Sequence, residues 1–495
     1  MIKAKALAHR VRSYTCHTEA SLRYRNRQQP DMRSCRMTAF QTLPLKPALL
    51  ASVETLGYAE MTPVQAHSLP PLLAGRDVIA QAQTGSGKTA AFGLGLLQAL
   101  DADTIRLQAL VLCPTRELAD QVSKAIRKLA ANIPNVKLLT LCGGMPLGPQ
   151  LASLTHDPHI VVGTPGRVQE HLKRGSLHGG GIKVLVLDEA DRMLDMGFSD
   201  AIDDIVSRIA KHHQTLLFSA TYPEAIRAAS KRLQSDPVEV TVEAPATAEA
   251  AIEQRFIEVE PAHKLDALAQ LLAGERGQQT LVFCNMRRDV DAVAQELDRR
   301  GFSALPLHGD MEQRDRDEVL VRFANHSCAI LVATDVAARG LDIAALPLVL
   351  SYDIAHDPDT HTHRIGRTGR AGQAGMAITL CTPRERPKAA NIEEMQGAPL
   401  PWRPLKLAPP RGKTLNLAPM KTVVIDAGRQ DKLRPGDILG ALTGDAGLDA
   451  KDIGKIDVFA TRAYVAITRA LANKALERLR AGKIKGRNFR VRSLG

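Results

Sequence analysis

Residues 82–89 have the sequence AQTGSGKT, and this stretch decides how the N-terminal half of the chain folds. It follows an apolar run typical of a strand and precedes a run typical of a helix. Its small residues let backbone N–H groups close on phosphate oxygens, while Lys88 can neutralise the β- and γ-phosphates and the Thr89 hydroxyl can ligate Mg²⁺. The stretch departs from the strict phosphate-loop pattern because Ala82 occupies the first glycine position. It predicts a nucleoside triphosphate site at the start of a helix.

Acidic residues further along the chain supply the partner that a bound metal requires. The apolar run Leu185 to Leu187 leads directly into Asp188 and Glu189, which places both carboxylates at the carboxyl end of a buried strand, beside the phosphate loop. Asp188 is expected to hold Mg²⁺ through water, and Glu189 to position and deprotonate the attacking water. An acidic strand end by itself more often caps a helix, but its pairing with the phosphate loop favours the metal site.

Short apolar strands alternate with helical stretches from about 75 to 220, and the same rhythm recurs from 252 to 382. This alternation is typical of parallel βαβ units, so we expect an α/β fold with two doubly wound parallel-sheet domains. Aromatic residues make up only 3% of the chain, so aliphatic side chains must pack the cores. Beyond residue 419 the expected order of elements is βαββαβ, which RRM domains share.

Composition and patterning divide the chain into six parts. Residues 1–36 lack an apolar core and any periodicity, so a secretory signal is excluded; we expect a disordered extension or a segment upstream of the true start, with Met37 opening the patterned sequence. The expected parts are the basic extension 1–36, a first domain 37–242, a linker 243–251, a second domain 252–382, a second linker 383–418 and an RRM-like domain 419–495.

The positive charge is concentrated at the two ends of the chain. The total is +12, of which residues 1–36 contribute +7 and residues 411–495 contribute +10, leaving −5 for the middle. Basic segments flanking a mildly acidic body attract polyanions, so nucleic acid is the expected partner. No apolar run approaches the roughly 18 residues that span a bilayer, so we expect no membrane crossing.

Cysteine usage points to a reducing compartment. The seven cysteines form no C-x-x-C pair and no cluster at metal spacing, so a zinc site is not supported. Several lie in apolar strand-like runs, where reduced cysteine acts as a small hydrophobic residue. We expect a cytoplasmic, monomeric protein.

The acidic motif Asp188 to Asp191, together with the phosphate loop, resembles the DEAD-box ATP-dependent RNA helicases. The other motifs of that family follow in order over residues 37–382, which makes the resemblance specific. They are Phe40, Gly57-Tyr58 and Thr62 to Gln65; 114–119 (PTRELA), 143–144 (GG), 164–167 (TPGR) and 219–221 (SAT); then 282–285 (VFCN), Gln313 with Arg316, 333–335 (ATD), 339–342 (RGLD) and 363–370 (HRIGRTGR).

This resemblance implies two RecA-like domains that hydrolyse ATP with Mg²⁺ only when the cleft between them closes. It makes Phe40 the ring that stacks on adenine, Gln65 the reader of the adenine edge and Asp342 the ribose contact. The full nucleotide set is Phe40, Gln65, Thr84, Gly85, Ser86, Gly87, Lys88, Thr89 and Asp342, with Thr89 and Asp188 as metal ligands. The catalytic set is Lys88, Asp188, Glu189, His363, Arg367 and Arg370, the last two acting as arginine fingers.

The resemblance also implies contacts to the RNA backbone, which carry no sequence code. Small or hydroxyl residues would let phosphates approach, arginines would supply charge, and bending of the strand would separate a few base pairs locally. The residues concerned are Gly143, Gly144, Thr164, Gly166, Thr334 and Gly340, with Arg116, Arg167, Arg316 and Arg339.

The C-terminal segment departs from an ordinary RRM domain. Its third strand offers a single aromatic, Tyr464, where several stacking rings are usual, so base stacking on the flat sheet is not expected. Residues 433–444, 452–456 and 483–487 instead resemble the C-terminal domain of one bacterial DEAD-box helicase. That implies a 23S rRNA hairpin near the peptidyl-transferase centre as target, and a role on pre-50S particles. The candidate RNA ligands are Lys421, Arg429, Lys432, Arg434, Lys455, Arg462, Lys483, Lys485 and Arg487.

Two functions remain open from the residues alone. The first is an RNA-stimulated ATPase that unwinds short duplexes in ribosomal RNA during large-subunit assembly. The second is an ATP-gated RNA clamp or assembly scaffold, in which hydrolysis serves only release, because clamping uses the same residues. A DNA helicase is disfavoured by the Gln65 motif and by the C-terminal domain.

Overall fold

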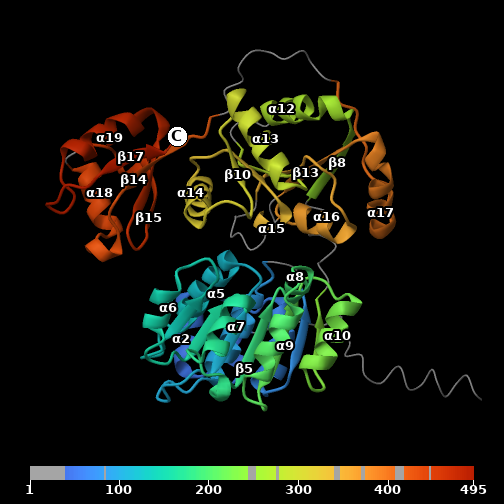
Figure 1. The fold of residues 1–495 in the computed structure, drawn as a ribbon, viewed down its shortest axis with the longest axis vertical. Coiled ribbons are helices and arrows are strands. Elements are labelled where there is room, and N and C mark those ends of the chain that lie inside the picture. Colours follow the sequence, from blue (N-terminus) through green and yellow to red (C-terminus); the bar gives the residue numbers. More distant parts are fainter. Residues whose placement is uncertain are drawn as a thin grey trace, which may run out of the picture.

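The computed structural model describes residues 39–82, 85–242, 252–274, 278–338, 346–369, 374–406, 417–444 and 447–494, and these form three domains (Figure 1). The predicted extension 1–36 and the predicted linker 243–251 lie outside the described residues. Within the described part of the chain, none of the helices combines the length and the apolar character needed to cross a bilayer.

The first domain is a seven-stranded parallel sheet with helices on both faces. The strand order is β3-β4-β2-β5-β6-β1-β7. The strands are β1 (Val78–Gln81), β2 (Ala109–Leu112), β3 (Leu138–Leu141), β4 (Ile160–Gly163), β5 (Val184–Asp188), β6 (Gln214–Ser219) and β7 (Val238–Thr241). The helices are α2 (Pro47–Thr55), α3 (Pro63–Leu73), α4 (Lys88–Ala99), α5 (Arg116–Leu129), α6 (Leu147–Ser153), α7 (Pro165–Arg174), α8 (Ala190–Asp195), α9 (Ser199–Ser207) and α10 (Glu224–Leu233).

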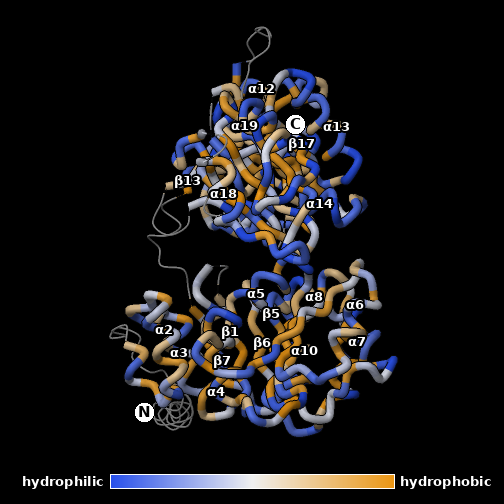
Figure 2. The backbone as a smooth tube through the Cα atoms, turned by 90° about the vertical axis from the view of Figure 1, so that its left-hand side faces the viewer, coloured by the Kyte–Doolittle hydropathy of each residue, from blue (hydrophilic) through white to orange (hydrophobic). Residues whose placement is uncertain are grey.

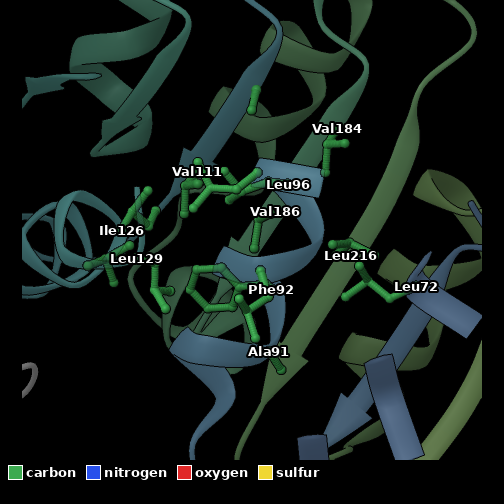
Figure 3. Close-up of a cluster of buried hydrophobic side chains, with 14 of the residues drawn as sticks. Leu72, Ala91, Phe92, Leu96, Val111, Ile126, Leu129, Val184, Val186 and Leu216 are labelled. Carbon is green, nitrogen blue, oxygen red and sulfur yellow. The ribbon is translucent and has the colours of Figure 1, made fainter. Parts of the chain in front are cut away.

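Strand β5 shows why its sequence is a continuous apolar run. Val184 and Val186 belong to the core on one face of the sheet, whereas Leu185 and Leu187 belong to the core on the other face. Successive side chains of a strand point to opposite faces, so a strand covered on both sides must be apolar throughout. On the first face Phe92 of α4 packs among the side chains of α5 and the sheet (Figure 3), and apolar residues gather along the central strands (Figure 2).

The second domain repeats this design with six parallel strands in the order β10-β11-β9-β12-β13-β8. The strands are β8 (Ile252–Glu258), β9 (Thr280–Phe283), β10 (Ala304–Leu307), β11 (Ile330–Ala333), β12 (Leu348–Ser351) and β13 (Gly375–Cys381). The helices are α12 (Lys264–Gly274), α13 (Arg287–Arg299), α14 (Gln313–Ala324), α15 (Asp335–Ala338) and α16 (Pro358–Ile365). Both doubly wound domains predicted from the sequence are confirmed.

The segment expected as the second linker, 383–418, begins as folded structure. It contains helix α17 (Arg386–Gln396), followed by a short stretch that bridges to the edge strand β8. There the Phe256 N–H donates to Pro401 O at 3.1 Å, and Arg403 N–H donates to Phe256 O at 2.8 Å. Ile392 and Leu400 are buried in one cluster with Phe256. The described residues up to 406 therefore belong with the second domain, because burial of their apolar side chains holds them there.

The C-terminal domain has the predicted βαββαβ order and a four-stranded antiparallel sheet, β15-β16-β14-β17. Its elements are β14 (Met420–Ile425), α18 (Pro435–Thr443), β15 (Ile453–Val458), β16 (Ala463–Thr468), α19 (Ala472–Ala481) and β17 (Val491–Leu494). Both helices cover one face of this sheet, around a core that includes Val423, Ile438, Val465 and Leu479.

The other face of this sheet packs against α14 of the second domain (Figure 1). Val321 of α14 is buried against Val424 and Tyr464, and Asn325 Nδ2 donates to Thr422 Oγ1 at 2.9 Å. The sheet face that an ordinary RRM domain offers to RNA bases is thus covered, and Tyr464 is only 5% exposed. This agrees with the expectation that bases do not stack on the sheet.

Candidate nucleotide and RNA site

The phosphate loop ends at Gly87, whose φ of 98° lies in the left-handed region, and α4 starts at the next residue. Lys88 is 6% exposed, and its Nζ donates to the loop carbonyl of Ala82 at 2.7 Å. The ammonium group therefore lies across the loop, beside the unpaired N–H groups of the helix start, where it can bind a phosphate oxygen. Of the predicted loop contacts, Gly85, Ser86 and Thr89 lie in the described part of this turn, while Thr84 lies outside it.

Gln65 links the motif Thr62 to Gln65 to this loop. Its Oε1 accepts the Thr62 N–H at 2.9 Å, and its Nε2 donates to Gly87 O at 3.1 Å. A Cβ atom added to Gly87 would lie 2.6 Å from that Nε2, so the contact requires a glycine. These two hydrogen bonds place the side-chain amide of Gln65 at the edge of the phosphate loop.

Phe40 is placed differently from its predicted role. Its ring is 1% exposed and belongs to the first-domain core, 6.3 Å from the ring of Tyr58. Tyr58 is the exposed aromatic of the pair, at 40%. Stacking of Phe40 on adenine, which requires a free ring face, stays a prediction.

The acidic motif lies at the end of β5, as predicted. Asp188 is 3% exposed, and its burial raises its pKa to about 7, against the opposing effect of Lys88. Glu189 turns the chain from strand into α8 with a φ of 54°, a left-handed conformation that costs energy for a residue with a Cβ. Such strain is typical of functional sites, and here it holds two carboxylates at the mouth of the phosphate loop.

Asp191 links this motif to residues 219–221. Its Oδ2 accepts both the backbone N–H of Thr221 at 3.1 Å and the Thr221 hydroxyl at 3.0 Å. The element predicted to couple the acidic motif to domain closure is therefore bonded directly to it.

In the second domain, the surface that carries Arg364 and Arg367 faces the acidic motif and the phosphate loop; we call it the arginine side, and the surface around the phosphate loop the phosphate side. Arg367 is 7% exposed and lines a small hollow with Asp335, His363 and Arg364. The Nδ1 atom of His363 is buried and has no hydrogen-bond partner within the described residues. A buried imidazole nitrogen left unpaired in a hollow suits a site that a phosphate or a bound water completes. Arg370 and Asp342 lie outside the described residues.

Helix α16 faces α8 across the cleft. Burial raises the pKa of Asp359 on α16, and Asp357 acts in the same direction, while Arg192 on α8 lowers it. The charges of the acidic motif and of α16 are therefore close enough to affect one another. The arginine side and the phosphate side belong to one cleft.

Predicted RNA contacts of both domains meet at one seam. Arg116 Nη1 donates to Gln313 Oε1 at 2.5 Å, and Arg316 Nη2 lies 2.8 Å from Glu117 Oε1. Gly144 has a φ of 67°, and a Cβ atom there would lie 1.9 Å from the Arg116 guanidinium. The seam joins the two domains through residues that the family resemblance assigns to RNA.

The remaining predicted RNA residues differ in availability. Thr164 Oγ1 accepts the Gly143 N–H at 3.2 Å, and Gly166 faces open space. Arg167 is engaged in the protein, because it donates to Met145 O at 3.1 Å. Thr334 is 8% exposed, and Arg339 and Gly340 lie outside the described residues.

In the C-terminal domain, two basic loops come together at the start of α18. Lys485 Nζ donates to Lys432 O at 3.0 Å and lies 3.5 Å from Asp437 Oδ2. Lys432 and Lys485 both have positive φ values, 60° and 52°, and Arg434 caps α18. We call Lys432, Arg434 and Lys485 the basic loop cluster.

Two other candidates lie elsewhere in that domain. Arg462 points into the domain interface, where it lies 3.4 Å from Glu318 and 3.4 Å from Asp426. Lys455 is exposed on β15 and lies 3.3 Å from Asp457. Arg462 is therefore occupied by protein carboxylates, a role that the sequence alone did not indicate.

Comparison with known proteins fits this geometry. The family model DEAD/DEAH box helicase matches residues 62–229, the model Helicase conserved C-terminal domain matches 263–372, and the model DbpA RNA binding domain matches 422–493. Over 461 residues, 92% of this chain and 100% of the relative, the chain is 54% identical to the ATP-dependent RNA helicase DbpA of Escherichia coli. The chain belongs to the DEAD-box RNA helicases. Its three matched segments make it a helicase of the DbpA type, with ATPase activity.

Two other similar proteins cover less of this helicase. It is 44% identical over 357 residues to the DEAD-box ATP-dependent RNA helicase CshA of Bacillus cereus, covering 72% of this chain and 68% of the relative. The solved structure described as S. cerevisiae Dbp5 bound to RNA and ADP BeF3 matches with 29% identity and a TM-score of 0.66, over 74% of this chain and 95% of that one. Both comparisons cover less of this chain than that with DbpA of Escherichia coli, which extends over 92% of it.

Sequence reasoning missed the residues that hold the site together. Arg364 is 1% exposed, although it lies within the quoted motif 363–370 as one arginine among three. Glu117 lies within the quoted 114–119 motif and pairs with Arg316 across the cleft. Neither differs in type from surface charges nearby, so only the fold distinguishes them.

Proposed function

We propose that this helicase uses ATP and Mg²⁺ to separate short RNA duplexes locally, and that its C-terminal domain directs it to a hairpin of 23S rRNA near the peptidyl-transferase centre in assembling large ribosomal subunits. The observation that carries the proposal is a cleft with phosphate-binding groups on one wall and Arg367 on the other, joined to a docked domain that carries a basic loop cluster. The protein acts as a monomer in the cytoplasm.

The first domain supplies the binding half of the reaction. Lys88 and the N–H groups at the start of α4 would hold the β- and γ-phosphates, and Thr89 and Asp188 would hold the metal, which neutralises developing phosphate charge. The raised pKa of Asp188 fits a cation, because a nearby positive charge restores the carboxylate form of a buried acid. Glu189 would orient the attacking water and accept its proton.

The second domain supplies the half that makes hydrolysis conditional. Arg367 and Arg370 would stabilise the charge that spreads over the γ-phosphoryl oxygens, and His363 would contact the phosphate side through its unpaired nitrogen. These groups act only when the two domains close. RNA favours closure because its contacts lie on both sides of the seam formed by Arg116, Gln313, Glu117 and Arg316.

The C-terminal domain would select the RNA target. One face of its sheet is covered by α14, and the loops at the start of α18 and before β17 present the basic loop cluster instead. Docking on α14 would fix a bound hairpin relative to the second domain, so that a neighbouring duplex enters the cleft in one orientation. The likeness to Escherichia coli DbpA over its full length supports this assignment.

An ATP-gated clamp remains the second candidate, because the seam between the domains would also serve to hold RNA without separating strands. A strand-displacement assay decides between them, with a short duplex joined to the 23S hairpin as substrate. Displacement that requires ATP hydrolysis supports unwinding; vigorous ATPase without displacement supports the clamp.

The target is tested by alanine at Arg434 and Lys485, measured against the hairpin RNA and against random single-stranded RNA. Loss of several charge-assisted contacts should weaken hairpin binding about tenfold or more while random RNA binding by the core changes little. Lys451→Ala is the matched control, since Lys451 is an exposed lysine of the same domain that lies 3.1 Å from Asp449. Equal losses on both RNAs would remove the targeting role.

A further inference from the structure

Lys264 is a buried lysine that none of the helicase motifs includes. It opens α12, its side chain is 9% exposed, and its Nζ lies 2.6 Å from Asp353 Oδ1 and 3.8 Å from Glu385 Oε2. It also lies over the ring of Tyr352, 4.9 Å from the centroid. A buried ammonium group is costly unless it is paired, so its anionic partners fix its place.

Asp353 carries this contact further into the domain. Its second oxygen, Oδ2, accepts the backbone N–H of Asn285 at 3.0 Å, and its backbone carbonyl accepts Arg364 Nη1 at 2.5 Å. Lys264 thus neutralises the side chain of Asp353. The same residue holds Asn285 through its carboxylate and Arg364 through its backbone carbonyl.

Arg364 is bonded through each of its guanidinium nitrogens. Nε and Nη2 donate to the carboxylate of Asp335 at 2.7 and 2.8 Å, and Nη2 also donates to Asn285 Oδ1 at 2.6 Å. The guanidinium carbon lies 5.1 Å from the centroid of the Phe283 ring. An arginine held on so many sides fixes the helix that carries it, which is α16.

Arg367 follows that helix directly. Helix α16 ends at Ile365, and Arg367 lies three residues after Arg364, in the hollow that Asp335 and His363 also line. The place of Arg367 in the cleft therefore depends on how Arg364 is seated.

We propose that Lys264 is a positioning residue for ATP hydrolysis. By neutralising Asp353 it seats Arg364, and the seating of Arg364 sets where Arg367 stands when the cleft closes. The proposal rests on the role of Arg367 in the proposed function. Lys264 touches neither nucleotide nor RNA in this scheme, and it acts only through the two bonded residues between.

The test replaces Lys264 by methionine in the full chain, which keeps the apolar stem and removes the charge. Asp353 is then left as a largely buried carboxylate without its cation, and Arg364 moves with it. The steady-state kcat for ATP with saturating RNA should fall about 10- to 100-fold, the size of effect that a small misplacement of a catalytic group produces. KM for ATP should change less than about threefold, because the ground-state contacts belong to the first domain.

A matched control separates positioning from folding. Arg300→Met removes ion pairs of the same domain, to Asp266 on α12 at 2.8 Å and to Glu296 on α13 at 2.8 Å. Thermal unfolding of both variants measures the cost to stability. A loss of kcat in Lys264→Met that Arg300→Met does not share supports positioning, and an equal loss in both overturns it.

The double variant Lys264→Met, Asp353→Asn removes both charges and folds even where the single variant does not, because an unpaired buried charge is the main cost of breaking such a pair. Its kcat should lie between those of Lys264→Met and the unaltered chain, at least about threefold below the latter. A kcat within about twofold of the unaltered chain, in the single or the double variant, overturns the proposal. Arg367→Ala is measured alongside: if it keeps full kcat, the proposed function fails, whereas if it loses kcat and Lys264→Met does not, only the role of Lys264 fails.

Discussion

The two walls of the nucleotide cleft are built in different ways. On the first-domain wall, Lys88, Gln65 and Asp191 are held by bonds to residues of the same wall, at Ala82, Gly87 and Thr221. On the second-domain wall, Arg367 follows helix α16, whose Arg364 is bonded to Asp335 and to the backbone carbonyl of Asp353. In the proposed function the first wall binds phosphates by itself, whereas the second acts only when it is brought up to the first. We infer that this difference would make hydrolysis conditional on closure.

The largest expected effect comes from the first wall. Glu189→Gln keeps the size of the side chain and removes the base, so kcat for ATP should fall about 1,000-fold while ATP binding stays within about twofold. Rapid-quench hydrolysis and equilibrium nucleotide binding measure the two quantities. Glu54→Gln, at an exposed glutamate of α2, is the control. If Glu189→Gln retains its kcat, Glu189 is not the base.

The second effect concerns pH. Burial raises the pKa of Asp188 to about 7, so the folded protein binds this proton more tightly than the unfolded chain. The group's stabilising contribution is full below the unfolded pKa near 3.8 and is lost as the pH rises through about 7. Asp188→Asn should therefore raise the free energy of unfolding at pH 8 by up to about 4 kcal/mol, with little change at pH 4.

Urea unfolding without nucleotide and with EDTA, at both pH values, measures this difference. Asp204→Asn, at a more exposed carboxylate of the same domain whose pKa is lowered by Arg208, should not stabilise the protein at pH 8. No pH dependence of the Asp188→Asn effect would contradict the buried, proton-binding state of the first wall.

A smaller effect is expected at the bond between Thr221 and Asp191, which is predicted to couple the first wall to domain closure. Thr221→Ala removes the hydroxyl bond to Asp191 and leaves the backbone bond, and hydrogen bonds to charged groups contribute about 1.5 to 3 kcal/mol. Strand displacement should fall about tenfold, more than ATPase does. Thr155→Ala, at an exposed threonine of the same domain, is the control. An unchanged rate of strand displacement in Thr221→Ala would show that the Thr221 hydroxyl has no role in coupling.

The smallest effect lies at the docked C-terminal domain. Glu318 on α14 pairs with Arg462 and Arg492 at 3.4 and 3.0 Å at the edge of the interface. Glu318→Ala should reduce stimulation of ATPase by hairpin RNA about threefold, and ATPase with unstructured RNA should not change, since ion pairs near a surface contribute little. The control is Asp298→Ala on α13. Equal changes with both RNAs would argue against an orienting role for the interface.

Much of the first wall could be predicted from the sequence because each of its motifs is a short contiguous stretch of the chain. The run Leu185 to Leu187 favours a strand buried on both faces, so the carboxylates after it were expected at the sheet edge beside the phosphate loop. The βαββαβ order of the C-terminal domain followed from local patterns in the same way. The strand and the order of elements depend on local periodicity and on turn residues, and both can be recognised in a short stretch of sequence.

The rest depends on contacts between distant residues. Phe40 looks like any exposed aromatic before a motif, yet it is buried in the core. Val321 is one of several apolar residues on α14, and the docked sheet explains its burial. Lys264 at a helix start is typical of a surface charge. Helix α17 was predicted as part of a linker because its segment is rich in lysine, arginine and proline. Its two buried residues, Ala389 and Ile392, do not stand out in that composition.

The central claim is that the first wall binds ATP and the second makes it react. It is tested most directly by Arg367→Ala, with ATP binding and single-turnover hydrolysis measured on the same protein with saturating RNA. The account predicts binding within about twofold of the unaltered chain and hydrolysis at least about 100-fold slower. A variant that loses binding and hydrolysis together, or that hydrolyses ATP at the original rate, would contradict it.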